Sequence, residues 1–172
     1  LLTLARIEHG AGSAQGAPVR LAEVARQVGL ELALPAVQKG IDLALEADDD
    51  ADTTVHGQEL LLHELVSNLV DNAIRYTPQG GSVLLRVARR EAGVVLEVSD
   101  SGPGIAADEH EKVFMPFYRA QATLEANPGG TGLGLAIVRD IAGLHGAVLA
   151  LGPNPGLDGR GLTVSLTFPG AR

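Results

Sequence analysis

The stretch LLHELVSNLVDNAIRYTP, residues 61–78, predicts the central helix of this protein. We expect the helix to run from about residue 58 to residue 76, because the Thr-Pro-Gln-Gly-Gly sequence at 77–81 then breaks it. Its apolar residues recur at helical spacing and form one face that can pack on a core. They are Leu62, Leu65, Val66, Leu69 and Ala73.

Three polar residues of the same helix, Glu64, Asn68 and Asn72, are four positions apart and therefore share one stripe. Asparagine is a poor helix former, so two of them inside a helix need an explanation. One explanation is an exposed face or a capping role. The other is a hard divalent cation such as Mg²⁺, which suits carboxamide oxygens and shares its ligands with phosphates. Arg75 and Tyr76 follow, where a cation could meet a phosphate and a ring could cover a sugar or base.

The remaining elements predict an α+β protein. Two further helices are expected at about 20–39 and 132–145. Strands are expected at about 41–47, 53–56, 82–89, 94–99, 147–151 and 161–168. Hairpins imply antiparallel pairing, so we expect a two-layer sandwich, with a mixed sheet covered on one face by about three helices. A doubly wound parallel sheet is disfavoured.

The composition excludes several classes of protein. The chain has 172 residues, of which 45% are hydrophobic and 20% charged, as in an ordinary soluble domain. Its formal charge of −8 argues against a nucleic-acid platform. The absence of cysteine excludes disulfides and thiolate metal sites. No apolar run approaches the ~20 residues that span a bilayer. Because the sequence begins without Met, we expect it to be part of a longer protein.

The sequence Asp100-Ser101-Gly102-Pro103-Gly104-Ile105 directly follows an apolar strand. An aspartate beside two glycines can simply make a turn. Alternatively, a carboxylate in a flat apolar slot accepts a hydrogen bond from an exocyclic amine such as that of adenine. The glycines would then let a planar ring lie close to the backbone.

Residues 129–138, GGTGLGLAIV, join a glycine-rich turn to an apolar helix. A helix N-terminus has unpaired N–H groups and a positive dipole end, which favour a bound phosphate. Glycine also serves tight turns and close helix packing, so this stretch has a purely structural explanation as well. No strand directly precedes the glycines, which argues against a dinucleotide-binding fingerprint.

Four stretches in this order resemble the N, G1, F and G2 boxes of the catalytic and ATP-binding domain of sensor histidine kinases. They are NLVDNA at 68–73, DSGPG at 100–104, VFMPFYR at 113–119 and GTGLGL at 130–135. The resemblance covers about residues 19–169. It implies a Bergerat-type fold of the GHKL ATPases that binds ATP and Mg²⁺, with a long ATP lid at about 106–131.

The resemblance also implies roles for individual residues. Asn72 matches the magnesium ligand, with Asn68 as a second ligand and Glu64 in support, and Asp100 matches the residue that recognises the adenine amine. Phe114 and Phe117 would anchor the lid. Catalytic roles fall on Glu64, Asn68 and Arg119, the last reaching the γ-phosphate. The nucleotide-binding set is Asn68, Asn72, Arg75, Tyr76, Asp100, Gly102, Gly104, Ile105, Phe114, Gly130, Thr131, Gly132, Leu133 and Gly134.

Three parts are expected along the chain. Residues 1–9 resemble the end of a dimerisation helix, residues 10–18 a linker, and residues 19–172 the catalytic domain. The phosphoacceptor histidine is not expected in this sequence. His63 precedes Glu64 as in an acceptor motif, but position 68 is Asn rather than Pro. We expect structural roles for the other histidines, with His145 ending or packing a helix.

The family implies transfer of the γ-phosphoryl group of ATP to a histidine of a dimerisation domain, for relay to a response regulator. Related ATPases place a water-activating Glu where this chain has Asn68, which cannot act as a general base. Alternatives are a nucleotide-responsive binding module, an ATPase of this fold, or an anti-sigma-type serine kinase. We expect this piece to be a monomer, from the cytoplasmic part of an inner-membrane, homodimeric sensor, without nucleic-acid or membrane contacts of its own.

Overall fold

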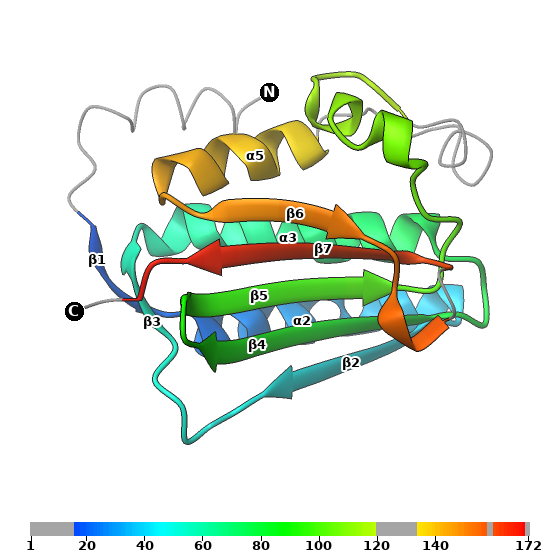
Figure 1. Ribbon diagram of the computed structural model, residues 1–172. Coiled ribbons are helices and arrows are strands. Elements are labelled where there is room, and N and C mark those ends of the chain that lie inside the picture. Colours follow the sequence, from blue (N-terminus) through cyan, green and yellow to red (C-terminus); the bar gives the residue numbers. More distant parts are fainter. Residues whose placement is uncertain (1–15, 120–133, 158–159, 171–172) are drawn as a thin grey trace.

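A five-stranded mixed sheet is the scaffold of the molecule (Figure 1). The computed structural model describes residues 16–119, 134–157 and 160–170. The strand order in the main sheet is β2-β4-β5-β7-β6. The strands are β1 (Ala17–Arg20), β2 (Asp42–Ala47), β3 (Thr54–Gly57), β4 (Ser82–Arg90), β5 (Gly93–Asp100), β6 (Val148–Gly152) and β7 (Leu162–Phe168). The helices are α2 (Leu21–Lys39), α3 (Glu59–Tyr76) and α5 (Gly134–Leu144), with short 3-10 turns η1 (Ala107–Glu109), η2 (Lys112–Phe114) and η3 (Pro155–Leu157).

The sheet is mostly antiparallel, as the hairpins predict. β4 pairs with β5, β5 with β7 and β6 with β7, all antiparallel. Among the described strands of this sheet, only β2 runs parallel to its neighbour, β4. The chain returns through β3 and α3 between these two strands, so both can run in the same direction. The mixed sheet is therefore confirmed.

The three helices cover one face of the sheet (Figure 1). α2 packs on β2 and β4, α3 packs on β4 and β5, and α5 packs on β6 and against α3. Alternate residues of β5, Val94, Leu96 and Val98, point toward the helices and are buried. They meet the predicted apolar face of α3, all five of whose residues are buried. Burial of this kind contributes roughly 25 cal/mol per Å² of apolar surface.

The N-terminal boundary differs slightly from the sequence prediction. Residues 17 and 18, expected to end a linker, already belong to β1, which pairs antiparallel with β3 in a separate two-stranded sheet. Val19 of β1 is buried and pairs with the buried Val55 of β3. The expected dimerisation-helix end at 1–9 lies outside the described residues. No helix among the described residues is both long and apolar enough to cross a bilayer.

Candidate nucleotide-binding site

The predicted site residues come together at one end of the helical layer. Asn68, Asn72, Arg75 and Tyr76 lie on the second half of α3, Asp100 and the glycines after it at the carboxyl end of β5, and Gly134 at the start of α5. Glu64 lies nearer the start of α3, and Ile105, Phe114 and Arg119 follow in the segment after β5. The side chain of Asn72 lies directly against the first residue of α5: a Cβ on Gly134 would be 3.0 Å from both Asn72 Oδ1 and Asn72 Nδ2. Two of the predicted boxes, distant in sequence, are therefore in contact. The predicted residues Gly130, Thr131, Gly132 and Leu133 lie outside the described residues.

Asp100 is the most perturbed acid of the site. Side chains alternate along a strand, so Asp100 points to the same side of β5 as the buried Val98, toward the helical layer. Its side chain is only 6% exposed. Burial raises the pKa of Asp100 to about 6, although hydrogen bonds from the backbone of Gly102 and Leu162 act in the opposite direction. Gly102 N donates to Asp100 Oδ1 at 2.9 Å. A buried carboxylate with capacity for further donors is suited to recognise an amine.

Gly102 and Gly104 lie so close to other backbone segments that a side chain at either position would collide with them. A Cβ on Gly102 would lie 3.0 Å from the Tyr76 carbonyl oxygen at the end of α3. Gly104 has a φ of 75°, and its Cβ would lie 2.9 Å from the carbonyl oxygen of Gly161. The turn 101–104 is thus held tightly between α3 and the β6–β7 connection.

Asn154 is a residue of this region that the sequence analysis did not single out. Its Nδ2 donates to the main-chain oxygen of Asp100 at 3.0 Å, and its Oδ1 accepts from Gly156 N at 3.1 Å. Gly161, with a φ of 73°, also contacts the Asp100 carbonyl. The surrounding sequence Pro-Asn-Pro-Gly signals only a turn, so its contact with β5 required the structure.

Along α3, the polar stripe forms as predicted. Glu64, Asn68 and Asn72 are all partly buried. Asn68 Nδ2 donates to the Glu64 carbonyl oxygen at 2.8 Å, which directs the Oδ1 of Asn68 away from that carbonyl. Asn68 and Asn72 thus offer carboxamide oxygens. The described residues contain no group of three or more His, Cys, Asp or Glu side chains that could hold a metal. Mg²⁺, which keeps waters and phosphate ligands, fits such a sparse donor set.

The end of α3 has a cation that the sequence analysis missed. Lys39, the last residue of α2, donates from Nζ to the carbonyl oxygens of Ile74 and Arg75, at 2.8 and 2.5 Å. These are orphan carbonyls of the last helical turn. Burial lowers the pKa of Lys39. Arg75 itself forms an exposed ion pair with Asp71 at 2.9 Å, and Tyr76 is partly buried.

The described first half of the predicted lid differs from the prediction in one residue. Phe117, expected to anchor the loop, is 68% exposed and has a φ of 67°. Val113 is buried instead, and η2 packs against α5. Phe117 lies inside the tight turn at 115–118, which Tyr118 N closes by donating to the Met115 carbonyl oxygen, and its side chain is exposed. Phe114 and Arg119 are partly buried, and Ile105 accepts a hydrogen bond from His110 through its carbonyl oxygen.

Three histidines have structural partners, as expected. His63 Nε2 lies 2.8 Å from Glu31 Oε2, between α3 and α2. His110 bonds the Ile105 carbonyl oxygen. His145 bonds the Ile141 carbonyl oxygen through Nδ1 and accepts from Gln58 N through Nε2, at 2.8 and 3.1 Å. His145 therefore ends α5 and packs structurally, which confirms its predicted role.

Comparison with known proteins identifies relatives of this chain. Residues 57–172 match the family described as "Histidine kinase-, DNA gyrase B-, and HSP90-like ATPase". The sensor protein kinase PmrB of Pseudomonas aeruginosa is 44% identical over 169 residues, covering 98% of this chain and 34% of that protein. The chain spans about a third of the length of the curated relatives it matches.

Two solved structures have the same fold. The mycobacterial sensor histidine kinase MprB is 29% identical with a TM-score of 0.75, covering 90% of this chain and 97% of that one. Full-length ShkA, in complex with AMPPNP, is 30% identical with a TM-score of 0.78, covering 98% of this chain and 34% of that one. The predicted two-layer fold is confirmed by these likenesses.

Proposed function

The chain belongs to the histidine kinase-, DNA gyrase B- and HSP90-like ATPase family, as a catalytic ATP-binding domain of the sensor histidine kinase type, and we propose how it acts. It transfers the γ-phosphoryl group of Mg-ATP to a histidine of a dimerisation domain. That histidine then passes the group to a response regulator. The observation that carries the proposal is the contact of Asn72 with the first residue of α5, at the end of the helical layer where Asp100 is buried.

The nucleotide is held from two sides. The Asp100 carboxylate accepts from the adenine amine, while the glycine turn 102–104 leaves room for the ring beside the backbone. The N-terminus of α5, starting at Gly134, presents N–H groups to the phosphates. Arg75 and Tyr76 contribute charge and ring surface beside the sugar and phosphates, and Arg119 acts on the γ-phosphate.

Asn72, with Asn68, would hold the magnesium ion through carboxamide oxygens. A bound Mg²⁺ neutralises charge on the transferring phosphoryl group. Glu64 supports Asn68, whose amide nitrogen is already bonded to the Glu64 carbonyl. The carboxamides of Asn68 and Asn72 cannot remove a proton, so they position groups instead.

Transfer to a protein is favoured over hydrolysis by residue 68. An asparagine cannot take a proton from water, so the helix offers no general base at this position. An ATPase of the same family would release inorganic phosphate instead. The whole protein would be a homodimeric sensor of the inner membrane, with this domain in the cytoplasm. Its partners are its own dimerisation domain and the response regulator.

The test is phosphoryl transfer between separate domains. The chain is incubated with Mg²⁺, γ-labelled ATP and an added histidine-bearing dimerisation domain. We expect acid-labile label on that domain, and loss of most of it with Asn72→Ala. Release of labelled inorganic phosphate without a labelled acceptor contradicts the proposal and favours an ATPase. Label on a serine favours a serine kinase.

A further inference from the structure

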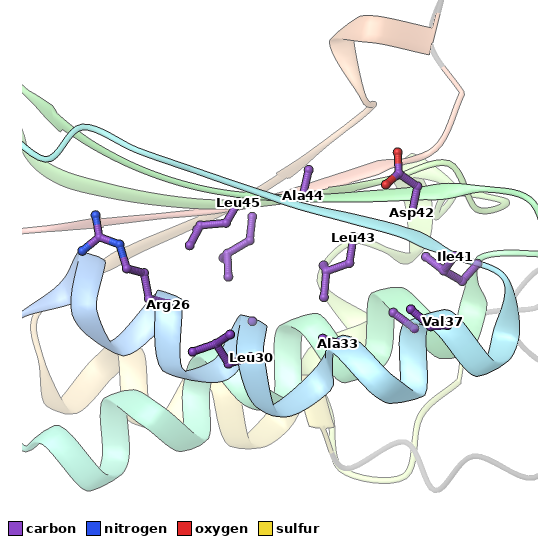
Figure 2. A pocket seen from close by; sticks show the side chains of 12 residues that line it. Arg26, Leu30, Ala33, Val37, Ile41, Asp42, Leu43, Ala44 and Leu45 are labelled. Carbon is purple, nitrogen blue, oxygen red and sulfur yellow. The ribbon is translucent and has the colours of Figure 1, made fainter.

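An apolar groove lies between α2 and the edge strand β2 (Figure 2). Its volume is about 400 Å³. Leu43 and Leu45 of β2 point toward α2, while Leu30, Ala33 and Val37 line the helical side. None of the predicted nucleotide-site residues lines it.

The helical side of the groove is unusually exposed for apolar residues. Leu30 is 80% exposed, Val37 72%, and Leu34 on the same face of α2 63%. Leu45 adds an apolar side chain from the strand at 36% exposure. Scattered exposed leucines need no explanation, but a contiguous patch beside a groove marks an interaction site.

The strand side of the groove is an open sheet edge. In the part of the chain that the structure describes, β2 pairs only with β4. Asp42 N donates toward β4, to the carbonyl oxygen of Gly81. Because backbone groups alternate sides along an extended strand, the N–H groups of Leu43 and Leu45 face the open edge. Such an edge can accept another strand.

Charge identifies the chemistry of the occupant. Residues 22–52, which form α2, β2 and the following turn, contain eight acidic and two basic side chains, a net charge of −6 out of −8 for the whole chain. Arg26 is already paired with Glu23 and Asp49, and Arg86 of the neighbouring strand β4 is paired with Glu46, so neither arginine offsets the remaining acidic side chains. Two copies of so acidic a surface repel each other, which disfavours self-association.

We propose that this groove binds an extended, basic segment of a partner polypeptide in which apolar residues alternate with lysine or arginine. The segment adds to β2 as a sixth strand of the main sheet. Its apolar side chains enter the groove between Leu45 and Val37, and its cations meet the acidic turn at 48–52. The proposal does not depend on the nucleotide site.

The test uses a fluorescent octapeptide of alternating valine and lysine, measured by anisotropy. We expect saturable binding to the parent chain that weakens with added salt. Leu30→Lys should weaken it at least tenfold, because this exposed residue adds a repelling charge in place of apolar surface. Val148→Lys is the matched control, since Val148 is 69% exposed on β6, the opposite edge of the sheet. It should leave binding unchanged.

Two further peptides separate strand addition from simple charge attraction. A block peptide of the same composition, four valines followed by four lysines, should bind at least tenfold more weakly. The alternating peptide with N-methyl groups on alternate amides, which removes its edge-facing donors, should also fail. Equal binding of the block peptide, equal effects of the two lysine variants, or no binding to the parent would each overturn the proposal. Concentration-dependent dimers that Leu30→Lys abolishes would assign the groove to a second copy.

Discussion

At the scale of single residues, we expect the ionisation of Asp100 to control nucleotide binding. The ionised Asp100 only accepts a hydrogen bond from the adenine amine, whereas the protonated side chain would also present its own proton to that amine. The pKa of Asp100 is about 6. The ionised fraction therefore falls about fourfold between pH 7.5 and 5.5. We expect the affinity for Mg-ADP, measured by calorimetry, to fall by about the same factor over this pH range. The fall is measured relative to the Asp100→Asn variant, whose affinity at the two pH values serves as the baseline. Since the variant sees the same phosphate titration, an identical pH profile for both would contradict the assigned role.

The same aspartate should lower the stability of the fold above pH 6. The folded state holds its proton up to a pKa of about 6, whereas an unfolded aspartate ionises near its model value of 3.8. Stability therefore falls as the pH rises from about 4 to 6, by up to about 3 kcal/mol. Asp100→Asn should be more stable than the parent at pH 7.5 and equal to it near pH 4. Urea unfolding at both pH values measures this; a variant that is less stable at pH 7.5 would disprove it.

At the scale of elements, His145 joins the end of α5 to the start of α3. Its Nε2 accepts from Gln58 N, and a Cβ on Gly57 would collide with its ring. The ring also meets Phe168 edge-on, with centroids 6.4 Å apart. One histidine thus links two helices and β7.

Two substitutions at this joint should be strongly coupled. His145→Ala leaves the Gln58 N–H without its acceptor, which costs about 1–3 kcal/mol. Gly57→Ala should cost a similar amount in the parent, because the added methyl displaces the ring, and much less in the His145→Ala background. Urea unfolding of the four proteins tests this, with the exposed His56→Ala as a control. Additive losses would show that His145 does not fill the space beside Gly57.

The elements themselves were largely predictable from the sequence. The α3 helix was predicted within one residue of its start, because its apolar period and its Thr-Pro breaker are local signals. The strands β4 and β5 follow from their alternation and their short turn. The anchor of the η2 segment was not predictable: Val113 and Phe117 are both apolar, and only the packing of η2 on α5 decides which is buried.

At the scale of the whole molecule, the candidate site combines elements that are far apart in sequence. The resemblance predicted that Asn72 and Asp100 share a site, and their elements do meet there. Asn154 escaped prediction because its contact with Asp100 spans 54 residues and uses a backbone oxygen. The α2–β2 groove also escaped, since exposed leucines on a helix look like core residues until the partner face is known.

The site and the groove lie on different parts of one sheet, and hydrogen exchange should distinguish their ligands. In the proposed site Mg-ADP would contact the end of β5 and the start of α5, so we expect it to slow exchange at residues 100–104 and 134–138. The valine–lysine peptide should instead slow the edge-facing amides of Leu43 and Leu45. At a hundredfold excess over Kd, either ligand also adds about 2.7 kcal/mol of global stability. Under native conditions, amides that exchange by local opening report the local contacts of each ligand, and the gain in global stability does not slow them. If Mg-ADP slowed the β2 amides as much as residues 100–104, the groove and the site would be coupled through β4 rather than independent.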